Sequence, residues 1–220
     1  MMAESTRRGV PEATVGRLPG YLRALTSLSE QGCVSVSSDD LADLLGLRSS
    51  QVRKDLSSLG SYGVRGVGYD VQRLSEQISA ELGLADEHPL VIVGLGNLGR
   101  ALAAYGQLAT RGFRVAALVD NDPALVGQQV HGLPVRALAD LDPELAAVAV
   151  AVIATPATVA QDVADALVAL GVRSILNLAP VVLRVPEQVD VRAVDLASEL
   201  QVLAFHAHQR DLASVCGDAG

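Results

Sequence analysis

The sequence predicts an α/β protein in two domains, an N-terminal winged helix-turn-helix domain and a C-terminal doubly wound parallel sheet. In the first third of the chain, amphipathic segments of helical period flank a turn that contains glycine. After Pro89, short apolar runs alternate with helical segments, which is typical of a parallel sheet covered by helices on both faces. We place the two domains at residues 1–85 and 86–195, followed by a C-terminal helix over 196–220.

Composition limits the class of protein. Half of the 220 residues are hydrophobic, which is enough to bury a core and excludes wholesale disorder. The longest apolar run, 146–154, has the length of a strand, so we expect no membrane span. An N-terminus without an apolar segment and two distant cysteines, Cys33 and Cys216, favour a cytoplasmic protein with reduced thiols. Four scattered histidines form no ligand set, and we expect no metal.

Charge is distributed unevenly between the two parts of the chain. Residues 1–75 carry nine Lys/Arg and eight Asp/Glu, a net charge of +1. Residues 76–220 carry eight Lys/Arg and seventeen Asp/Glu, a net charge of −9, which completes the −8 of the whole chain. This asymmetry is typical of a head that contacts nucleic acid on an acidic body.

The helix-turn-helix prediction depends on three helical segments and on the residues that end them. Ser37 or Ser38 offers an N-cap for the second helix, and Ser49 offers one for the third. The intervening turn at 46–48 contains glycine, and Gly60 closes the third helix. The expected helices are 11–32, 39–45 and 50–59.

The third helix has the polar residues of a DNA recognition helix at its N-terminal end. The outward positions are Ser50, Gln51, Arg53 and Lys54. Gln51 can bond adenine through two hydrogen bonds, and Arg53 or Lys54 can bond guanine. The alternative is a helical hairpin whose charged face is merely solvated.

Residues around this helix are candidates for contacts with the DNA backbone. Arg48 and Ser49 suit phosphates. Glycines spaced through 62–69 predict a small β-hairpin, a wing. Arg65 in this wing could reach the DNA backbone or the minor groove. A linking helix is expected over 70–88.

The second domain is expected to alternate strands with helices. Its first strand is a continuous apolar run, as in strands buried on both faces. The expected strands are 90–93, 115–119, a short strand near 135, 148–153, 174–178 and 191–194, and the expected helices are 98–110, 157–170 and 195–216.

A glycine-rich loop follows the first strand and opens a helix. Its residues are Gly94, Leu95, Gly96, Asn97, Leu98 and Gly99. The first glycine permits a tight turn, the second lets the backbone approach a pyrophosphate, and the third allows close packing of helix and strand. The helix N-terminus offers unpaired N–H groups to phosphates. This is the Rossmann dinucleotide fingerprint; the alternative is a glycine turn used only for packing.

An acidic residue lies where the dinucleotide site requires one. Asp120 ends the second strand, where its carboxylate would accept hydrogen bonds from the adenosine ribose. Asp122 nearby would repel a 2′-phosphate, which favours NAD+ and NADH over NADP(H). Thr155 and Pro156 follow the fourth main strand at the carboxyl edge, where open α/β sheets bind ligands. These two residues either line the nicotinamide side or simply start a helix.

The sequence offers no clear acid–base machinery to turn the cofactor over. Lys54, in the first domain, is its only lysine, and no His–Asp or Cys–His arrangement accompanies the glycine loop. Two other classes remain open. One is an NAD-dependent oxidoreductase whose N-terminal helices only dimerise, and the other is a CoA- or nucleotide-binding subunit without a DNA role.

Five stretches in order resemble the Rex family of redox-sensing transcriptional repressors over nearly the full chain. They are QVRKDL at 51–56, GSYGVRGVGYD at 60–70, VIVGLGNLGR at 91–100, ILNLAP at 175–180 and VDLA at 194–197. One departure is Leu178, where many members carry an aromatic residue, and it puts only the local packing near the ring in doubt.

The resemblance implies a homodimer that binds a palindromic operator and that NADH releases, while NAD+ competes and favours the bound form. It implies a C-terminal helix exchanged between subunits. It also implies a link between the subunits, in which Arg23 and Tyr105 meet Asp195 of the other copy. The expected function is therefore a repressor that senses the NADH/NAD+ ratio and is not an enzyme.

Overall fold

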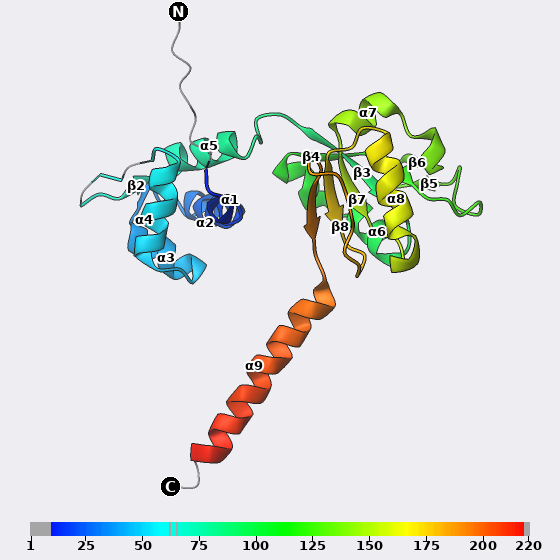
Figure 1. The fold of residues 1–220 in the computed structure, drawn as a ribbon. Helices are drawn as coiled ribbons and strands as arrows, with labels where there is room; N and C mark the ends of the chain where they lie inside the picture. Colours follow the sequence, from blue (N-terminus) through cyan, green and yellow to red (C-terminus); the bar gives the residue numbers. More distant parts are fainter. Residues whose placement is uncertain (1–9, 62, 65, 218–220) are drawn as a thin grey trace, which may run out of the picture. The chain divides into compact units, whose positions relative to one another are not determined.

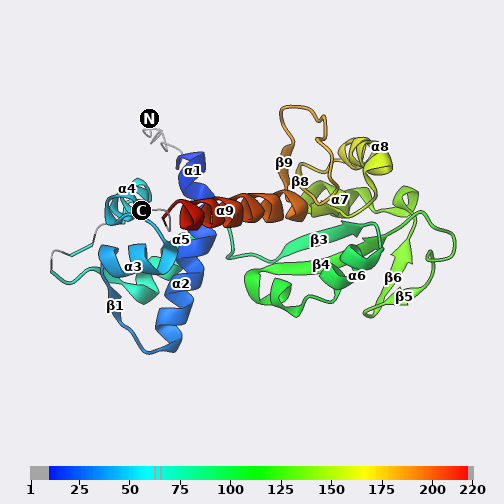
Figure 2. The same cartoon turned by 90° about the horizontal axis from the view of Figure 1, so that it is seen from below.

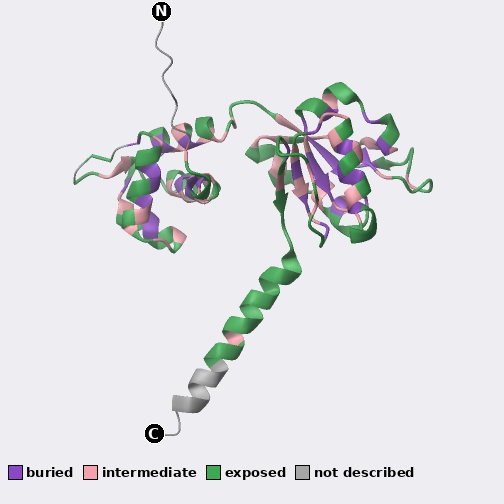
Figure 3. Ribbon diagram, viewed as in Figure 1, coloured by how far each residue is buried: buried purple, intermediate pink, exposed green. Residues whose placement is uncertain are grey.

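The computed structural model describes residues 10–61, 63–64 and 66–217, with side chains to residue 210 (Figure 1). The chain divides into two compact units, Met1–Asp86 and Glu87–Gly220. We call them the head and the body. Each unit is built around its own hydrophobic core, which appears as the buried segments in Figure 3.

The head packs its helices around one apolar core. Its elements are α1 (Glu12–Val15), α2 (Leu18–Glu30), β1 (Ser35–Val36), α3 (Ser38–Leu45), α4 (Ser49–Ser58), β2 (Tyr69–Asp70) and α5 (Val71–Glu81). Tyr21 and Leu25 of α2, Leu41 of α3, Leu56 of α4 and Ile78 of α5 are all fully buried in it. The helix-turn-helix prediction is confirmed, although the expected first helix is divided at Gly16–Arg17.

Local capping explains where the two helices of this motif begin and end. Ser37 accepts from the Asp40 N–H in a capping box, as expected for one of the two serines. Gly46 ends α3 in the left-handed conformation at φ +64°. Gly60, at φ +77°, follows α4 as predicted, because only glycine adopts this conformation without strain. The cap predicted at Ser49 is wrong, because Arg48 is the extended residue and Ser49 is already helical.

The predicted wing is present in reduced form. Val64 and Gly68 form one antiparallel bridge among the described residues of this loop. The base of the wing is held by an unforeseen two-stranded sheet, in which β2 pairs with β1. Arg65, the predicted backbone contact, lies outside the described residues.

The body is a doubly wound sheet, as predicted. Its strands are β3 (His88–Val93), β4 (Phe113–Val119), β5 (Gln129–Val130), β6 (Leu133–Arg136), β7 (Val150–Ile153), β8 (Ser174–Asn177) and β9 (Asp190–Ala193). They lie in the order β5-β6-β4-β3-β7-β8-β9, and every pair is parallel except β5–β6. The chain leaves β3 toward β4 on one side and returns to β7 on the other, so the strand order reverses at β3 and β7.

Helices cover both faces of this sheet (Figure 2). They are α6 (Asn97–Ala103), η1 (Gly106–Arg111), η2 (Leu138–Asp140), α7 (Pro143–Val148) and α8 (Ala157–Ala169). The remaining helix, α9 (Leu196–Gly217), does not cover the sheet (Figure 1). Helices α7 and α8 pack on the face that includes Val91 and Ile153. Helix α6 and η1 cover the opposite face, which includes Ile92 and Val152.

Two expected elements of the body have different bounds. The helix predicted over 98–110 ends at Ala103, and a 3₁₀ helix follows from Gly106. The predicted helix included Tyr105, but in the structure Tyr105 lies beyond the end of the glycine-loop helix. The strand predicted from residue 148 begins at Val150, because Val148 ends α7.

Helix α9 presents its side chains to solvent. Leu196, Leu200, Leu203 and Phe205 are exposed, each by more than half. Through residue 210 only Ala207 reaches intermediate burial. Over the part of the chain that the structure describes, no helix combines the length and the hydrophobicity of a membrane span.

Candidate nucleotide site and DNA-reading face

The candidate nucleotide site lies at the carboxyl ends of β3 and β7, where the strand order reverses. Gly94 directly follows β3, and Thr155 is the second residue after β7. A Cβ at Gly94 would lie 2.8 Å from the Ala154 carbonyl group and 2.9 Å from the Thr155 side chain, so the two loops are in contact. Open α/β sheets bind ligands in such a crevice.

The three glycines of the loop have the three environments that the fingerprint requires. Gly94 has φ +95° and the close contacts just described. A Cβ at Gly99 would collide with the Gly94 carbonyl oxygen, so α6 packs directly against the loop. A Cβ at Gly96 would meet no described atom within 4 Å. The second glycine therefore leaves space beside the N-terminus of α6, where Asn97 begins the helix and the pyrophosphate is expected.

Asp120 is placed to support this loop as well as a ribose. Its Oδ2 accepts the Leu95 N–H at 2.7 Å, and its Oδ1 accepts the Asp122 N–H at 2.9 Å. A carboxylate offers about four acceptor positions, so both oxygens retain capacity for ribose hydroxyls. Asp122 is exposed, and its own carboxylate accepts the Ala124 N–H at 2.9 Å.

Thr155 carries a polar atom that lacks a partner. Among the described residues, its Oγ1 is the one buried side-chain oxygen or nitrogen without a hydrogen bond. A buried hydroxyl without a partner is costly, and such groups call for an explanation. A ligand in the crevice beside Gly94 would supply the missing bond, which fits a dinucleotide. Pro156 is exposed and occupies the N-cap position of α8, so Thr-Pro also starts the helix.

Arg100, which was not among the residues predicted for the site, also stabilises the loop. Its Nε donates to the Leu95 carbonyl oxygen at 2.8 Å from the second turn of α6. Leu95 is 1% exposed, and its backbone is held on one side by Arg100 and on the other by Asp120. Leu98 remains 45% exposed on α6. The position of an arginine directly after Gly99 was the available signal.

The three residues expected to link subunits all lie at the surface. Arg23 is exposed on α2. Tyr105 is 46% exposed, and its hydroxyl donates to Gln107 Oε1 at 2.8 Å. Asp195 caps α9: its carboxylate accepts from the Ala197 and Ser198 N–H groups and the Ser198 hydroxyl. These hydrogen bonds hold the pKa of Asp195 below its ordinary value.

The N-terminal end of α4 exposes most of the predicted DNA-contacting residues. Arg48, Ser50, Arg53 and Lys54 are exposed, whereas Val52 points into the core. Ser49 is half-buried at the first position of the helix. Arg53 donates to Ser38 Oγ at 2.9 Å and to Ser49 Oγ at 3.3 Å, so it bridges the two helices of the motif.

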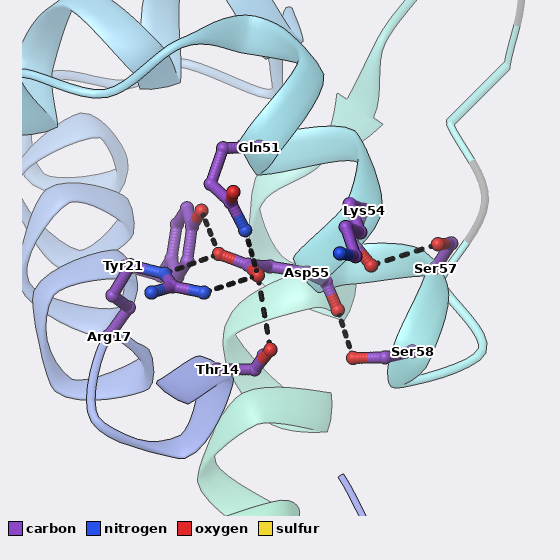
Figure 4. Close-up of polar contacts among 8 residues, drawn as sticks. All are labelled: Thr14, Arg17, Tyr21, Gln51, Lys54, Asp55, Ser57 and Ser58. Carbon is purple, nitrogen blue, oxygen red and sulfur yellow. Dashed lines mark hydrogen bonds and ion pairs between the residues drawn. The ribbon is translucent and has the colours of Figure 1, made fainter. Parts of the chain in front are cut away.

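Gln51 differs from these neighbours because it belongs to a polar cluster around Asp55 (Figure 4). Asp55 is 1% exposed, and its two oxygens accept five hydrogen bonds. Oδ1 accepts from Thr14 Oγ1 at 3.1 Å, an Arg17 terminal nitrogen at 2.7 Å and Gln51 Nε2 at 2.8 Å. Oδ2 accepts from Arg17 Nε at 2.7 Å and the Tyr21 hydroxyl at 3.0 Å.

We call these five residues the Asp55 cluster. It fastens α4 to α1, to α2 and to the junction between them. Arg17 meets the carboxylate through two parallel bonds, which is the strong geometry for this pair. The cluster was not predicted from the sequence, although Asp55 interrupts the inward-facing stripe of Val52 and Leu56.

The cluster shifts the pKa values of its members. Burial raises the pKa of Asp55, but the hydrogen bonds from Arg17, Gln51, Tyr21 and Thr14 together outweigh burial and hold it below the ordinary value. The hydrogen bond to Asp55 raises the pKa of Arg17. Burial, followed by the contact with Asp55, raises the pKa of Tyr21 far above its usual range. The cluster therefore favours an ionised Asp55 at neutral pH.

We predict that Asp55→Asn destabilises the head in a pH-dependent way. Because the folded-state pKa of Asp55 is lowered, its contribution is present above the ordinary value near 4 and is lost as pH falls through the folded-state pKa. At pH 7 we expect a loss of about 2 kcal/mol, below the ~3–5 kcal/mol typical of a broken buried pair, because water can reach Arg17. Urea titrations at pH 7 and pH 3, followed by tyrosine near-UV circular dichroism, measure the difference.

Tyrosine signals suit this test because three of the four, Tyr21, Tyr62 and Tyr69, belong to the head. The difference between wild type and variant should be smaller at pH 3 than at pH 7, because the contribution of the ionised carboxylate begins to be lost below the ordinary pKa. A difference of equal size at both pH values would mean that the charge of Asp55 does not stabilise the head.

The described residues contain no group of three or more His, Cys, Asp or Glu side chains that could hold a metal ion.

Comparisons with known proteins match both units. Residues 9–57 match the family model described as "Putative DNA-binding protein N-terminus", and residues 85–181 match the one described as CoA binding domain. The chain is 60% identical over 205 residues to the Redox-sensing transcriptional repressor Rex of Streptomyces coelicolor, covering 92% of this chain and 80% of that protein. It is 43% identical to Rex of Desulfitobacterium hafniense, covering 91% and 97% of the two chains.

Solved structures agree with the sequence matches. The crystal structure of RSP in complex with beta-NAD+ and operator DNA superposes with a TM-score of 0.86 at 30% identity, covering 96% of this chain and 99% of that one. The structure of RSP in complex with beta-NADH gives a TM-score of 0.84 at 30% identity, covering 94% and 98%. RSP is a Rex-family repressor, and a third crystal structure of it gives a TM-score of 0.85.

Proposed function

The chain belongs to the Rex family of redox-sensing transcriptional repressors, and on that premise we propose that it represses transcription in response to the NADH/NAD+ ratio. The head binds operator DNA, and the body binds NAD+ or NADH. The observation that carries the proposal is that the similarity to Rex covers 92% of the chain and so includes both units. RSP, a member with 30% identity, is described in complex with NAD+ and operator DNA and in complex with NADH.

The body binds the dinucleotide at the carboxyl edge of the sheet. The N-terminus of α6 and the space beside Gly96 receive the pyrophosphate, and Asp120 receives the adenosine ribose. Asp122 adds negative charge beside that ribose and disfavours a 2′-phosphate. Thr155 and Pro156 lie on the nicotinamide side. The oxidised ring carries a positive charge, and burying an unpaired charge in an apolar site is costly, so this side favours NADH.

The head contacts DNA through the exposed end of α4. Ser50, Gln51, Arg53 and Lys54 face base edges, while Arg48 and Ser49 face phosphates. Arg65 of the wing reaches the backbone or the minor groove. Four of these side chains are exposed in the described head, which supports this assignment.

Switching requires two arrangements of a homodimer that differ in their affinity for NADH. We infer that α9 is exchanged between subunits, which its exposed leucines and Phe205 support. Asp195 at its start then meets Arg23 and Tyr105 of the other copy. Binding of NADH closes the two bodies together and moves the heads out of register with the two half-sites, which must lie about one DNA turn apart.

The protein acts as a sensor in the cytoplasm and does not turn its cofactor over. Its only lysine, Lys54, belongs to the head, so the body has no lysine of its own that could serve as a proton donor. The alternative is an NAD-dependent oxidoreductase. Steady consumption of NADH with a panel of carbonyl substrates would support that alternative.

Fluorescence anisotropy tests the proposed function directly. The protein is titrated onto labelled palindromic promoter fragments at low salt, where phosphate contacts are strongest. NADH, NAD+, NADPH and CoA are then added separately. We expect NADH at micromolar levels to release the DNA, and NAD+ to oppose that release. Failure to bind DNA under every condition, or release by CoA rather than NADH, would contradict the proposal.

A further inference from the structure

The Asp55 cluster constrains how Gln51 can contact DNA. Gln51 lies at the reading end of α4, next to the exposed Ser50 and half-buried itself. Its amide is the only group of the cluster that belongs to the predicted DNA-contacting set. The carboxylate that it meets is 1% exposed and fixed by Arg17 through two bonds of 2.7 Å. The partner of Gln51 is therefore rigid.

The chemistry of this contact fixes the direction of the Gln51 amide. An ionised carboxylate can only accept hydrogen bonds, so the amide nitrogen must face Asp55 and the carbonyl oxygen must face away. The bond from Nε2 to Asp55 Oδ1 is 2.8 Å long, as expected for a charge-assisted bond (Figure 4). Without such a partner, a glutamine amide turns freely and can present either a donor or an acceptor.

We propose that Asp55 is a specificity-determining positioning residue, which holds the Gln51 carbonyl oxygen toward DNA and so selects bases that present an amino group. In the major groove, adenine and cytosine present such donors, whereas guanine O6 and thymine O4 are acceptors. The outward carbonyl oxygen bonds the first pair of bases and repels the second. This inference rests on the proposed function, because it requires that α4 reads DNA.

Within one turn of α4, Gln51 is the residue that would contact the base, and Asp55 is the residue that fixes its orientation. Asp55 itself does not reach the DNA, because its two oxygens are occupied by five donors inside the head. It acts only through Gln51. Thr14 donates to the same oxygen that Gln51 does, and its side-chain hydrogen bond goes to Asp55 and not to a predicted DNA-contacting residue, which makes Thr14→Val a matched control for loosening the cluster.

The experiment measures base preference rather than affinity alone. Wild-type protein first selects its operator from a randomised palindromic duplex library. Anisotropy titrations then use duplexes in which each position of a half-site carries each of the four base pairs. Wild type, Gln51→Ala, Asp55→Asn and Thr14→Val are compared, and the position that Gln51 reads is the one whose profile changes in Gln51→Ala.

At that position we expect wild type to favour the two base pairs that place the amino-bearing base, adenine or cytosine, on one and the same strand over the two reversed pairs, by about tenfold. Gln51→Ala should erase this preference. Asp55→Asn should erase it too, because an asparagine can accept from or donate to Gln51, and the amide is then free to turn. Thr14→Val should keep the preference, and every variant should keep its profile at the other positions.

Several results would overturn the inference. They are a wild-type profile that does not favour adenine and cytosine on the same strand over both reversed base pairs, an unchanged profile in Asp55→Asn, or a loss of the same preference in Thr14→Val. A merely structural role of Asp55 would lower affinity for all duplexes by one factor and leave the profile intact. If Asp55→Asn lacks the near-UV signal of the folded head, the profiles of wild type and Gln51→Ala decide. A wild-type protein that binds DNA without any cofactor response contradicts the proposed function but leaves this test in force.

Discussion

Gly96→Val is expected to weaken NADH binding by about 100-fold or more while leaving the protein folded. Gly96 has φ −67° and ψ −167°, an extended conformation that valine adopts readily. A Cβ at this position meets no described atom within 4 Å outside its chain neighbours, so a side chain there enters the space in which we place the pyrophosphate. Loss of two charge-assisted hydrogen bonds at about 1.5–3 kcal/mol each accounts for the size of the effect. Titration of NADH fluorescence measures it.

Gly99→Ala is the matched comparison within the same loop. Its methyl group would collide with the Gly94 carbonyl oxygen, so α6 must move away from β3. We expect this smaller substitution to lower the thermal stability of the body, whereas Gly96→Val should melt within a few degrees of wild type. If Gly96→Val bound NADH with wild-type affinity in its folded form, the pyrophosphate would not lie at this loop.

Asp195→Asn is expected to raise the NADH concentration needed for half-release of DNA by about tenfold or more. Asparagine is as good an N-cap as aspartate, so α9 keeps its start, while the charge that the proposed link would offer to Arg23 of the other subunit is lost. A coupling of about 1–3 kcal/mol between the two ligands corresponds to factors of about 5–150. Anisotropy titrations with and without NADH measure the coupling.

Two controls separate charge from helix capping. Asp190→Asn removes the same charge from an exposed position on β9, five residues earlier, and should leave release unchanged. Ser198→Ala removes the hydroxyl that bonds Asp195 at 2.7 Å without changing charge. Equal effects of Asp195→Asn and Asp190→Asn, or normal release in Asp195→Asn, would rule out the proposed link between subunits.

The geometry of the glycine loop could be predicted because its determinants are local. Gly94, Gly96 and Gly99 each have a steric environment that depends on a few neighbouring atoms, and the contacts at the three positions agree with the expected turn, open space and close packing. Asp120 follows the next strand, which must lie beside the first in a parallel sheet. Short-range rules of turn and strand were therefore sufficient to locate the loop and its acid.

Element bounds were harder to predict where apolar periodicity is compatible with two structures. One helix was expected over 98–110, and Leu102 and Leu108 do pack against the same cluster, but Tyr105 adopts ψ +90° and the chain continues as a 3₁₀ helix. The apolar run at 146–154 likewise includes the end of a helix and a strand. Hydrophobicity alone cannot distinguish these cases.

The Asp55 cluster could not be predicted from spacing, because its partners are distant in sequence. Arg17 lies 38 residues before Asp55, and Thr14 lies 41 residues before it. What the sequence does show is a carboxylate within an apolar stripe, between Val52 and Leu56. A charged residue in that position requires a partner, but only the packing of α1 and α2 against α4 identifies it.

The arrangement of α4 has a consequence for how operator preference can diverge among descendants of this protein. Ser50, Arg53 and Lys54 are exposed, so their replacement can alter DNA contacts at little cost to folding. Gln51 is different, because its neighbour Asp55 also secures the core of the head. New base preferences should therefore arise readily at the three exposed positions. A side chain at position 51 that donates to guanine O6 or thymine O4 would require a coordinated change at position 55. Such paired substitutions are the mutational signature to seek in laboratory evolution.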